Sequence, residues 1–385
     1  MKYKKIKLKE IANINMGQSP KGSSYNNKHN GVPFLQGNKT FGRLYPTIDT
    51  WTTEPTKIGK KESILMSVRA PVGDLNIANQ DICIGRGLCS IEMKNKNNKY
   101  LYYLLRNSMQ EIKRKSTGTV FDSINRKELE DIEIFNFGEE QQNKILNILF
   151  KIDNKIEINT QINDNLFEMI EQYIKENFYN NTDVRISAIN ELGKVQGGYA
   201  FKSKDLLDEI TNNKIFKIKN IGSNGVDINN TQYIYDEVAD KVDKKFLLNR
   251  GDVIVAMTGA ELGKTGYLYG NRNKFFLNQR VGVIRGNNEK NSLYLKCIFL
   301  LEEMKNSLNS KGYGSAQPNI SSSDIEKIEI PIPDEIELNN FYNIAKPIYD
   351  KMILNSEENQ YLSQLRDTLL PKLMNGEIDL DKIEI

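Results

Sequence analysis

The stretch Gly118–Ile134, "GTVFDSINRKELEDIEI", occurs a second time in altered form as Gly314–Ile330, "GSAQPNISSSDIEKIEI". The two stretches align without gaps at an offset of 196 residues, which pairs Ile124 with Ile320. Self-similarity at a fixed offset indicates a chain built from two like units. The repeat therefore decides how the other motifs of this sequence are interpreted.

The repeat continues toward the start of each copy, where smaller offsets indicate loops of different length. The matching stretches are "EIANINMGQ" (10–18) with "ELGKVQGGY" (191–199), "ILMSVRAPVGDLNIA" (64–78) with "IVAMTGAELGKTGYL" (254–268), and "CIGRGLCSI" (83–91) with "LNQRVGVIR" (277–285). Gly73 pairs with Gly263, which predicts a tight turn after a strand in both copies. Arg86 pairs with Arg280, and two interpretations stay open: a shared phosphate contact or a shared structural ion pair.

Each copy ends in a long segment with helical periodicity. A heptad that starts at Ile145 gives two seams, apolar at the ends and polar in the middle. The predicted seam positions are Ile145, Ile148, Ile152, Asn159, Ile162, Leu166 and Met169 in the first segment and Phe341, Ile344, Ile348, Asn355, Leu362, Leu365 and Leu369 in the second. We expect the two helices to pair, with the asparagines fixing the register; the alternative is that each lies on its own domain. A helix of about 35 residues is about 50 Å long.

The remaining segments mix short β-branched runs, amphipathic helices and Gly-rich turns, which is typical of an α+β fold. The predicted organisation is a pair of tandem, pseudo-symmetric domains, each followed by a long helix, with the two helices forming an antiparallel coiled-coil spacer. The expected boundaries are domain 1 at 1–138, helix at 139–178, linker at 179–185, domain 2 at 186–333, helix at 334–375 and tail at 376–385. Pro371 and Gly376 are expected to break the second helix.

The composition excludes several classes of protein. The 53 basic and 50 acidic residues give a net charge of +3, so charge alone does not indicate nucleic-acid binding. One histidine, His29, and three cysteines leave almost no material for a metal site or for His-based or Cys-based catalysis. No run of about 18 apolar residues and no secretory signal occur, so we expect a cytoplasmic protein without a membrane segment.

One stretch resembles a phosphate-binding P-loop. Thr258–Thr265, "TGAELGKT", ends in Gly-Lys-Thr, but it is one residue too short for the loop that wraps phosphates with backbone N–H groups. The following "GYLYG" predicts a strand and a turn, whereas a P-loop leads into a helix N-terminus. The glycine is better explained as the tight turn of the repeat, with Lys264 attached to it.

The whole pattern resembles the specificity (S) subunit of type I restriction-modification systems. The resemblance rests on the duplication, the long helices, "SVRAPVGDLNIANQDICIGRGL" (67–88), "GDVIVAMTGAELGKTGYL" (251–268) and the ending "LRDTLLPKLMNGEI" (365–378). It implies two target-recognition domains that each read half of a bipartite site in double-stranded DNA, and a helix pair that carries two methyltransferase subunits, with restriction subunits as further possible partners. It also implies no catalytic centre in this chain, with S-adenosylmethionine, ATP and Mg bound by partner subunits.

Recognition domains read base edges with Arg, Lys, Asn and Gln and hold phosphates with basic, hydroxyl and backbone N–H groups. Gly/Ser/Thr-rich loops beside such residues give the candidate contacts, although a solvated polar loop is the simpler explanation for each of them. The candidates are Gln18, Lys21, Ser23, Ser67, Arg69, Arg86, Lys115, Thr117 and Thr119 in the first copy and Tyr199, Lys202, Thr258, Lys264, Gln279, Arg280, Lys311, Tyr313, Ser315, Gln317 and Asn319 in the second.

Three other functions stay open on the sequence. The chain could be a stand-alone DNA-binding decoy or regulatory homologue of the S subunit. It could be a nucleotide-dependent enzyme that uses the Lys264 turn, or a coiled-coil scaffold that does not read DNA. Salt-sensitive DNA binding separates the scaffold from the DNA readers, because phosphate contacts release counterions.

Overall fold

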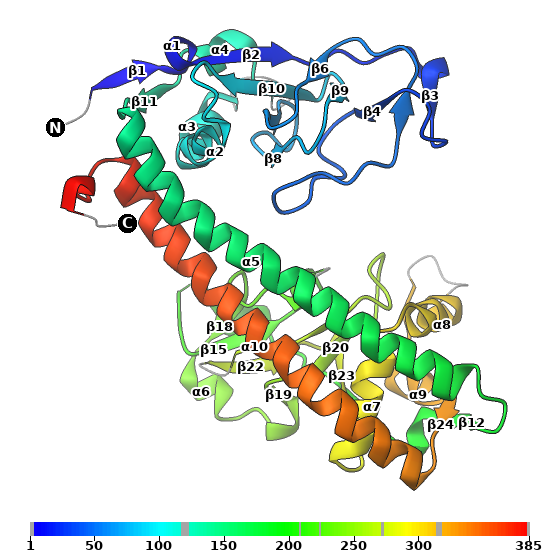
Figure 1. The fold of residues 1–385 in the computed structure, drawn as a ribbon. Helices are drawn as coiled ribbons and strands as arrows, with labels where there is room; N and C mark the ends of the chain where they lie inside the picture. Colours follow the sequence, from blue (N-terminus) through cyan, green and yellow to red (C-terminus); the bar gives the residue numbers. More distant parts are fainter. Residues whose placement is uncertain are drawn as a thin grey trace. The chain divides into compact units, whose positions relative to one another are not determined.

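The computed structural model describes residues 4–116, 123–207, 209–222, 225–270, 273–312 and 318–382 (Figure 1). The chain divides into two compact units: unit 1 comprises Met1–Asn154 and Leu362–Ile385, and unit 2 comprises Lys155–Tyr361. Both contain helices and small sheets, which confirms the α+β prediction. No helix within these described ranges is long and apolar enough to cross a membrane.

The repeated stretch forms the same structure in both units. Asn125 caps helix α4 (Arg126–Glu130) in a capping box with Glu128, and Ser321 caps α9 (Ser322–Glu326) in a capping box with Asp324. Each short helix leads into an edge strand, β11 (Glu133–Phe135) or β24 (Glu329–Ile332). β11 pairs with β1 (Lys5–Lys7), and β24 pairs with β12 (Arg185–Ala188). The local signal that revealed the repeat is therefore a capped helix followed by a strand.

Unit 1 is built on two further sheets. One is antiparallel, with the order β2 (Ala12–Met16), β10 (Leu88–Met93), β7 (Ile64–Ser67), β8 (Leu75–Ile77). The other has the order β3 (Tyr25–Asn26), β5 (Trp51–Thr52), β4 (Val32–Leu35), β9 (Ile82–Ile84), β6 (Ile58–Gly59). Strand β7 is buried on both faces: Ile64 and Met66 join the core that includes α2 (Asn98–Asn107), and Leu65 packs toward the second sheet.

Unit 2 repeats this arrangement. Its four-stranded sheet has the order β13 (Gly193–Gly197), β23 (Val281–Gly286), β20 (Val253–Ala256), β21 (Thr265–Tyr267). Its five-stranded sheet has the order β14 (Leu206–Leu207), β18 (Gln232–Ile234), β15 (Asn213–Phe216), β22 (Lys274–Leu277), β19 (Leu247–Leu248). Helices α7 (Glu289–Leu300) and α8 (Glu302–Gly312) take the places of α2 and α3 (Met109–Ser116). The matching strand orders confirm the internal repeat.

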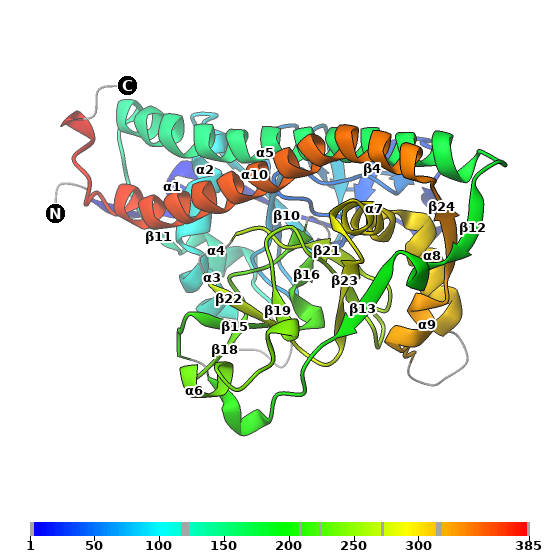
Figure 2. The same cartoon turned by 90° about the horizontal axis from the view of Figure 1, so that it is seen from below.

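The two long helices pair with each other and are antiparallel. Helix α5 (Glu139–Ile174) and helix α10 (Glu335–Met374) lie side by side in both views (Figures 1 and 2). Asn159 donates to the Asn359 side chain at 3.0 Å, and Asn355 donates to the Asn163 side chain at 2.8 Å. These two contacts are equivalent under the repeat, and Asn159 and Asn355 are only 1% and 2% exposed. The predicted polar break in the seam is therefore present. The first part of α5 packs in the core of unit 1 and its last part in the core of unit 2, whereas α10 packs first in unit 2 and last in unit 1. The alternative, in which each helix lies only on its own domain, is therefore wrong.

The heptad register is wrong at four seam positions. Ile162, Met169, Ile344 and Leu365 are exposed. Ile145, Asn159, Phe341 and Asn355 are buried, and Ile148, Ile152, Leu166, Ile348, Leu362 and Leu369 are half-buried. The buried positions of α5 follow the 3.6-residue repeat of a straight helix more closely than a strict heptad. They are Gln142, Ile145, Leu149, Asp153, Ile156, Asn159, Asn163, Ile170 and Ile174. Over about ten turns, the length of α5, this difference moves the buried face by about one residue.

Helix α10 does not break at Pro371. The helix continues to Met374, with the Asn375 N–H donating to the Pro371 carbonyl at 2.9 Å. A proline in the last turn removes only one backbone donor and its ring is exposed, so the helix tolerates it here. Gly376, with φ of 70°, ends the helix as predicted.

Candidate nucleic-acid interface

One end of the four-stranded sheet of unit 1 gathers several predicted contact residues. The end of β2, the start of β10 and the end of β7 meet there, because the three strands are antiparallel neighbours. The Gln18 N–H donates to the Ile84 carbonyl at 2.9 Å, and the Val68 N–H donates to the Gly87 carbonyl at 2.9 Å. Arg69 forms an isolated β-bridge with Ser123. Segments far apart in the sequence therefore bring Gln18, Arg69 and Arg86 to one sheet end.

This sheet end carries exposed basic side chains that make no ion pair with the residues that the structure describes. Lys21, Arg69 and Arg86 are exposed, and none makes an ion pair with any residue in the described ranges. Gln18 and Ser23 are exposed beside Lys21. Unpaired cations on fixed turns suit the phosphate contacts that position a protein on a duplex.

Unit 2 forms the corresponding sheet end. The Tyr199 N–H donates to the Leu277 carbonyl at 2.8 Å, and the Met257 N–H donates to the Arg280 carbonyl at 3.0 Å. Thr258 forms a β-bridge with Asn319, which matches the bridge between Arg69 and Ser123 in unit 1. The exposed candidates are Tyr199, Lys202, Gln279, Arg280, Lys311 and Asn319, whereas Thr258 is half-buried.

The equivalence of Arg86 and Arg280 is wrong by one residue. The Val68 N–H bonds to Gly87 and the Met257 N–H bonds to Arg280, so Arg280 occupies the place of Gly87. Arg86 therefore corresponds to Gln279. The alignment of 83–91 with 277–285 is therefore out of register by one residue. No ion pair holds either arginine to another described residue, so a structural ion pair shared by the two copies is absent from those ranges.

Two candidate residues serve the protein's own structure. Ser67 is buried; its hydroxyl donates to the Pro71 carbonyl at 2.7 Å and accepts from the Asp74 N–H at 2.9 Å, which holds the turn closed. Lys115 donates to the Asp131 carbonyl at 3.3 Å and lies 3.7 Å from Glu111. The sequence did not predict these hydrogen-bond partners, because a Ser at the end of a strand and a Lys in a helix are usually exposed to solvent. Thr117, Thr119, Tyr313, Ser315 and Gln317 lie outside the described residues.

The glycine turns have the predicted backbone. Gly73 and Gly263 have φ of 98° and 76°, and each begins the return of a hairpin: β7 to β8, and β20 to β21. Lys264 leads directly into strand β21, and its ammonium lies 2.7 Å from Glu261. The segment therefore lacks the helix N-terminus that a P-loop requires, and its lysine already has an acidic partner. This geometry does not support nucleotide binding at Lys264.

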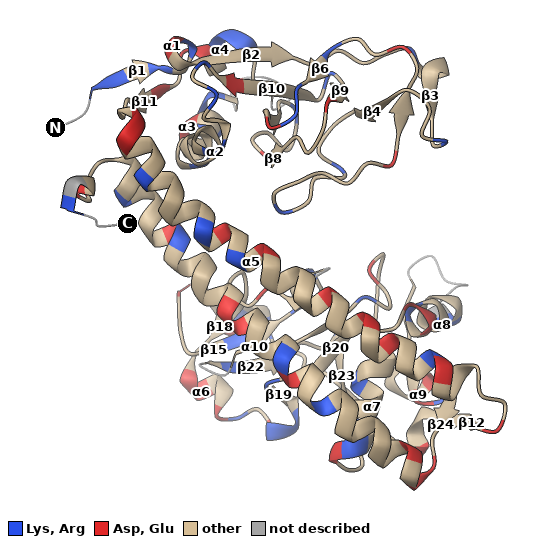
Figure 3. Cartoon of the chain, in the orientation of Figure 1, with Lys and Arg blue, Asp and Glu red and all other residues tan. Residues whose placement is uncertain are grey.

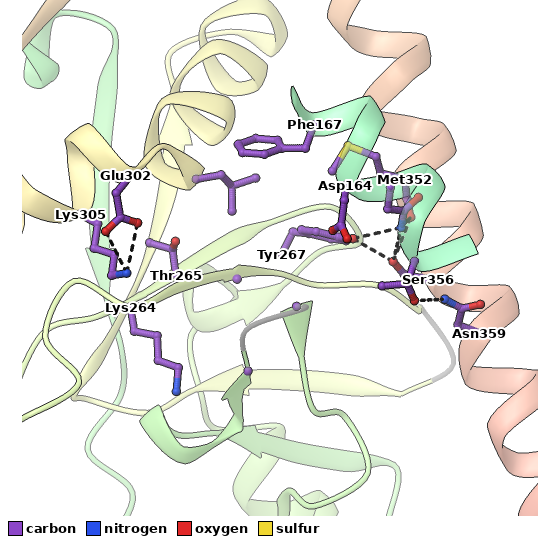
Figure 4. Close-up of a pocket in the computed structure, with 16 residues that line it drawn as sticks. Asp164, Phe167, Lys264, Thr265, Tyr267, Glu302, Lys305, Met352, Ser356 and Asn359 are labelled. Atoms are coloured by element: carbon purple, nitrogen blue, oxygen red, sulfur yellow. Dashed lines mark hydrogen bonds and ion pairs between the residues drawn. The ribbon is translucent and has the colours of Figure 1, made fainter. Parts of the chain in front are cut away.

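A cavity of about 390 Å³ lies beside Lys264 in unit 2 (Figure 4). Its walls carry the carboxylates Asp164 and Glu302, and Lys305 is paired with Glu302 at 3.2 Å. Burial raises the pKa of Asp164. At its floor the Tyr267 hydroxyl meets the Ser356 hydroxyl at 2.9 Å. The lining holds two lysines as well as these carboxylates, and both lysines are already paired, Lys264 with Glu261 and Lys305 with Glu302. Among the described residues the cavity therefore offers no unpaired cation for a phosphate group.

Sequence reasoning missed basic residues that border the same sheet ends. Lys57 is exposed and precedes strand β6; its carbonyl accepts from the Ile84 N–H at 2.8 Å, and the neighbouring Thr56 hydroxyl donates to the Gln18 carbonyl. In unit 2, Lys244 and Lys245 lie on the turn that precedes β19, and Phe246 packs on Tyr199 with ring centroids 5.4 Å apart. The sequence signal that could have predicted these residues is a basic residue directly before a short edge strand. Figure 3 shows charges of both signs over the rest of each unit.

Comparison with known families decides what this duplicated architecture is. The family of type I restriction modification DNA specificity domains matches twice, over residues 1–168 and 181–364. The chain belongs to the specificity (S) subunit family of type I restriction-modification systems. The two matches account for most of the chain, in agreement with the resemblance that the sequence motifs carried.

Several relatives support the assignment of this S-family chain. It is 28% identical over 353 residues to the type I restriction enzyme MjaIX specificity subunit of Methanocaldococcus jannaschii, covering 85% of this chain and 80% of that one. A shorter match, 46% identical over 147 residues, joins it to the putative MjaX specificity subunit of the same organism, covering 38% of this chain and 35% of the relative. The S subunit from M. genitalium superposes with a TM-score of 0.60 at 16% identity, over 97% of this chain and 96% of that one. The fold is therefore that of the family.

Proposed function

We propose that this S-family chain reads a bipartite site in double-stranded DNA, with the sheet end of each unit reading one half. The observation that carries the proposal is the duplication of a sheet end with exposed basic residues that have no ion-pair partner within the described ranges. These residues are Arg69 and Arg86 in unit 1 and Lys202 and Arg280 in unit 2. Phosphate contacts fix a protein on the duplex, and neighbouring Arg, Gln and Asn side chains can then read base edges. In this proposal the chain performs no catalysis itself and works in the cytoplasm.

The proposed partners are two methyltransferase subunits, which bind S-adenosylmethionine, and restriction subunits that use ATP and Mg. An exposed apolar stripe on the helix pair supports this docking. Ile158, Ile162 and Met169 share one face of α5, and Leu354 and Leu365 share a face of α10, with exposed fractions from 37% to 57%. Under the repeat, Ile158 corresponds to Leu354 and Met169 to Leu365. Two equivalent apolar surfaces suit two copies of one partner.

The reading role is tested by mapping adenine methylation in cells that contain the methyltransferase subunit with or without this chain. A bipartite motif that disappears with the chain is the expected result. Methylation that is unchanged without the chain contradicts the proposal. A complex that binds both DNA and methyltransferase yet directs no methylation points to a decoy or regulatory homologue instead.

The docking surface is tested by single substitutions on the stripe. Met169→Glu and Leu365→Glu each place a charge on one of the two equivalent surfaces, so each should reduce the number of bound methyltransferase subunits from two to one. Native mass spectrometry measures that ratio directly. Ile186→Glu is the matched control, because Ile186 is as exposed as Met169 but lies on strand β12. Full stoichiometry in both stripe variants would place the docking surface elsewhere.

A further inference from the structure

An arginine anchors a loop of unit 1 on the helix pair. Arg43 lies in the loop 36–50 between β4 and β5, and its Nη1 donates to Asp153 Oδ1 on α5 at 3.0 Å. Its Nη2 donates to the backbone carbonyl of Asp153. The Asp153 side chain is fully buried, so this contact is a specific anchor of the loop on the helix and not a surface ion pair.

The same carboxylate joins the second helix and helix α2. Arg366 of α10 donates to Asp153 Oδ1 at 2.7 Å, and the Tyr103 hydroxyl donates to Oδ2 at 2.7 Å. Burial alone would raise the pKa of Asp153, but the neighbouring Arg366 and Arg43 outweigh it and hold that pKa below its usual value. Asp153 is therefore a charged hub that fixes α2, the Arg43 loop and both long helices to one another.

The other end of the Arg43 loop contacts the candidate interface. The Gln36 carbonyl accepts from the Gly87 N–H at 3.2 Å, and Gln36 Oε1 accepts from the Ser19 hydroxyl at 2.9 Å. That hydroxyl in turn accepts from the Arg86 N–H at 3.2 Å. Midway along the loop, Gly42 exchanges two hydrogen bonds with the Asn76 side chain on the central sheet. A short, well-anchored segment thus links the Arg86 turn to Asp153.

In unit 2, a different pair of residues connects the four-stranded sheet to helix α10. Glu357 of α10 accepts from Arg250 Nε at 2.7 Å, from Arg250 Nη2 at 2.9 Å and from the Gly270 N–H at 3.0 Å. Arg250 lies just before strand β20, and Gly270 lies just after strand β21. The Glu357 carboxylate therefore binds the Arg250 side chain before β20 and the backbone after β21. The turn from Thr258 to Lys264 lies at the opposite end of this hairpin. Hydrogen bonding from Arg250 lowers the pKa of Glu357.

We propose that the Arg43–Asp153 and Arg250–Glu357 contacts are positioning elements that set the number of base pairs between the two half-sites. This inference rests on the proposed reading of a bipartite target. Each base pair added to a spacer moves the next half-site by about 3.4 Å and turns it by about a tenth of a helical turn. A reading surface anchored by charged, geometrically specific hydrogen bonds resists such a displacement, whereas a loosened one follows it.

The test maps methylation in cells that contain the methyltransferase subunit with either the native chain, Arg43→Ala or Glu357→Ala. Both variants should keep the same bases in each half-site. Methylation of sites whose spacer is one base pair longer or shorter should rise about tenfold relative to the native chain, equivalent to about 1.4 kcal/mol of lost discrimination. Arg250→Lys should give an intermediate increase, because a lysine keeps the charge but cannot make the two parallel hydrogen bonds.

Two control variants remove ion pairs of similar length that do not touch the long helices. Arg126→Ala removes a contact of 2.7 Å to Glu130 in unit 1, and Arg185→Ala removes a contact to Glu191 in unit 2. Both should keep the native spacing. If Arg43→Ala does not fold, Glu357→Ala still decides the matter, because Arg250 and Glu357 are partly exposed.

The outcomes separate the two proposals. A native chain that directs no methylation overturns the proposed function and this inference together. A native motif whose spacing stays unchanged in every anchor variant overturns this inference alone. A uniform loss of methylation at sites of native spacing, with no new spacing, also overturns it, because that result shows a structural role only. Binding of the purified complexes to duplexes of three spacer lengths provides the second measurement.

Discussion

Unit 1 and unit 2 have the same backbone fold but different side chains at the exposed turns and at the contacts with the helix pair. The same antiparallel strand order, the same capped helix and the same glycine turns occur in both. By contrast, the turn that presents Arg86 in unit 1 presents Gln279 in unit 2, and the anchor on the helix pair is a buried Asp153 in one and a partly exposed Glu357 in the other. Backbone hydrogen bonds preserve the frame while side chains diverge, so the two units can hold different half-sites in equivalent ways.

The largest difference between the units should appear when their anchors are removed. Asp153→Ala leaves Arg366, which is 8% exposed, without its buried partner and should destabilise unit 1 by about 3–5 kcal/mol. Glu357→Ala should cost unit 2 only about 1–2 kcal/mol, because water reaches Arg250. Hydrogen exchange measured unit by unit resolves the two effects. Equal losses would show that burial does not distinguish the anchors.

The stability of unit 1 at low pH should also depend on Asp153. The pKa of Asp153 is lowered in the folded chain, so its contribution to stability is present above its unfolded pKa of about 3.9 and is lost as the pH falls through the folded value. Asp153→Asn should therefore show a flatter loss of unit 1 stability below about pH 4 than the native chain. Acid titration followed by circular dichroism measures this, with Asp183→Asn, an exposed residue before β12, as the control. Parallel curves for native chain and Asp153→Asn would contradict the assignment.

The asparagines at the centre of the helix pair offer a smaller and more local comparison. Asn163 accepts from Asn355 and donates to the Met352 carbonyl at 2.9 Å and to the Ser356 hydroxyl at 3.1 Å. Its repeat equivalent, Asn359, is less buried and makes fewer contacts. Asn163→Ala should cost about 2 kcal/mol, because it leaves the buried Asn355 amide unsatisfied.

Asn359→Ala is the matched control and should cost less than about 1 kcal/mol, because Asn159 keeps its 2.7 Å hydrogen bond to Glu358. Chemical denaturation gives both values. Replacing Asn159 and Asn355 together with Ile should instead preserve stability but loosen the alignment of the helices, since a buried polar pair fixes register. An unchanged methyltransferase ratio and an unchanged target spacing in that double variant would count against a register role.

The sequence allowed the fold to be predicted further than the site. The repeat, the glycine turns and the polar break at Asn159 and Asn355 all follow from local signals, namely spacing, turn chemistry and heptad pattern. The exact register does not follow, because a heptad and a straight helix differ by only a fraction of a residue per turn. That small drift exposes Ile162 and Met169 and buries Asp153 and Asn163 in the seam.

The candidate contacts were harder to predict because their environment is non-local. In the sequence, Asp153 resembles an ordinary solvent-exposed carboxylate. In the structure, Arg43, Tyr103 and Arg366 surround it from three distant segments. Ser67 resembles any loop serine, yet its hydroxyl closes the hairpin turn. Arg86 is exposed and has no ion pair with a described residue, whereas Lys115 donates to the Asp131 carbonyl; both differences depend on tertiary structure. Direct DNA contact by the exposed candidates stays a prediction.

The two turns that carry Arg86 and Gln279 should differ in how they affect DNA binding. Arg86 and Gln279 occupy equivalent positions, but only Arg86 carries a charge, so Arg86→Ala should reduce the salt slope of DNA binding by about one phosphate contact. Gln279→Ala should leave the salt slope unchanged and instead relax base preference in one half-site by about 1–3 kcal/mol if the amide reads a base edge. Binding titrations of the complete complex at several salt concentrations, on native and single-substituted sites, measure both quantities. Lys60→Ala, which removes an exposed ion pair with Asp81 on the same unit, controls for net charge alone. If Arg86→Ala and Lys60→Ala reduce the salt slope equally, the effect comes from overall charge. That result would contradict DNA contact by the sheet end of unit 1.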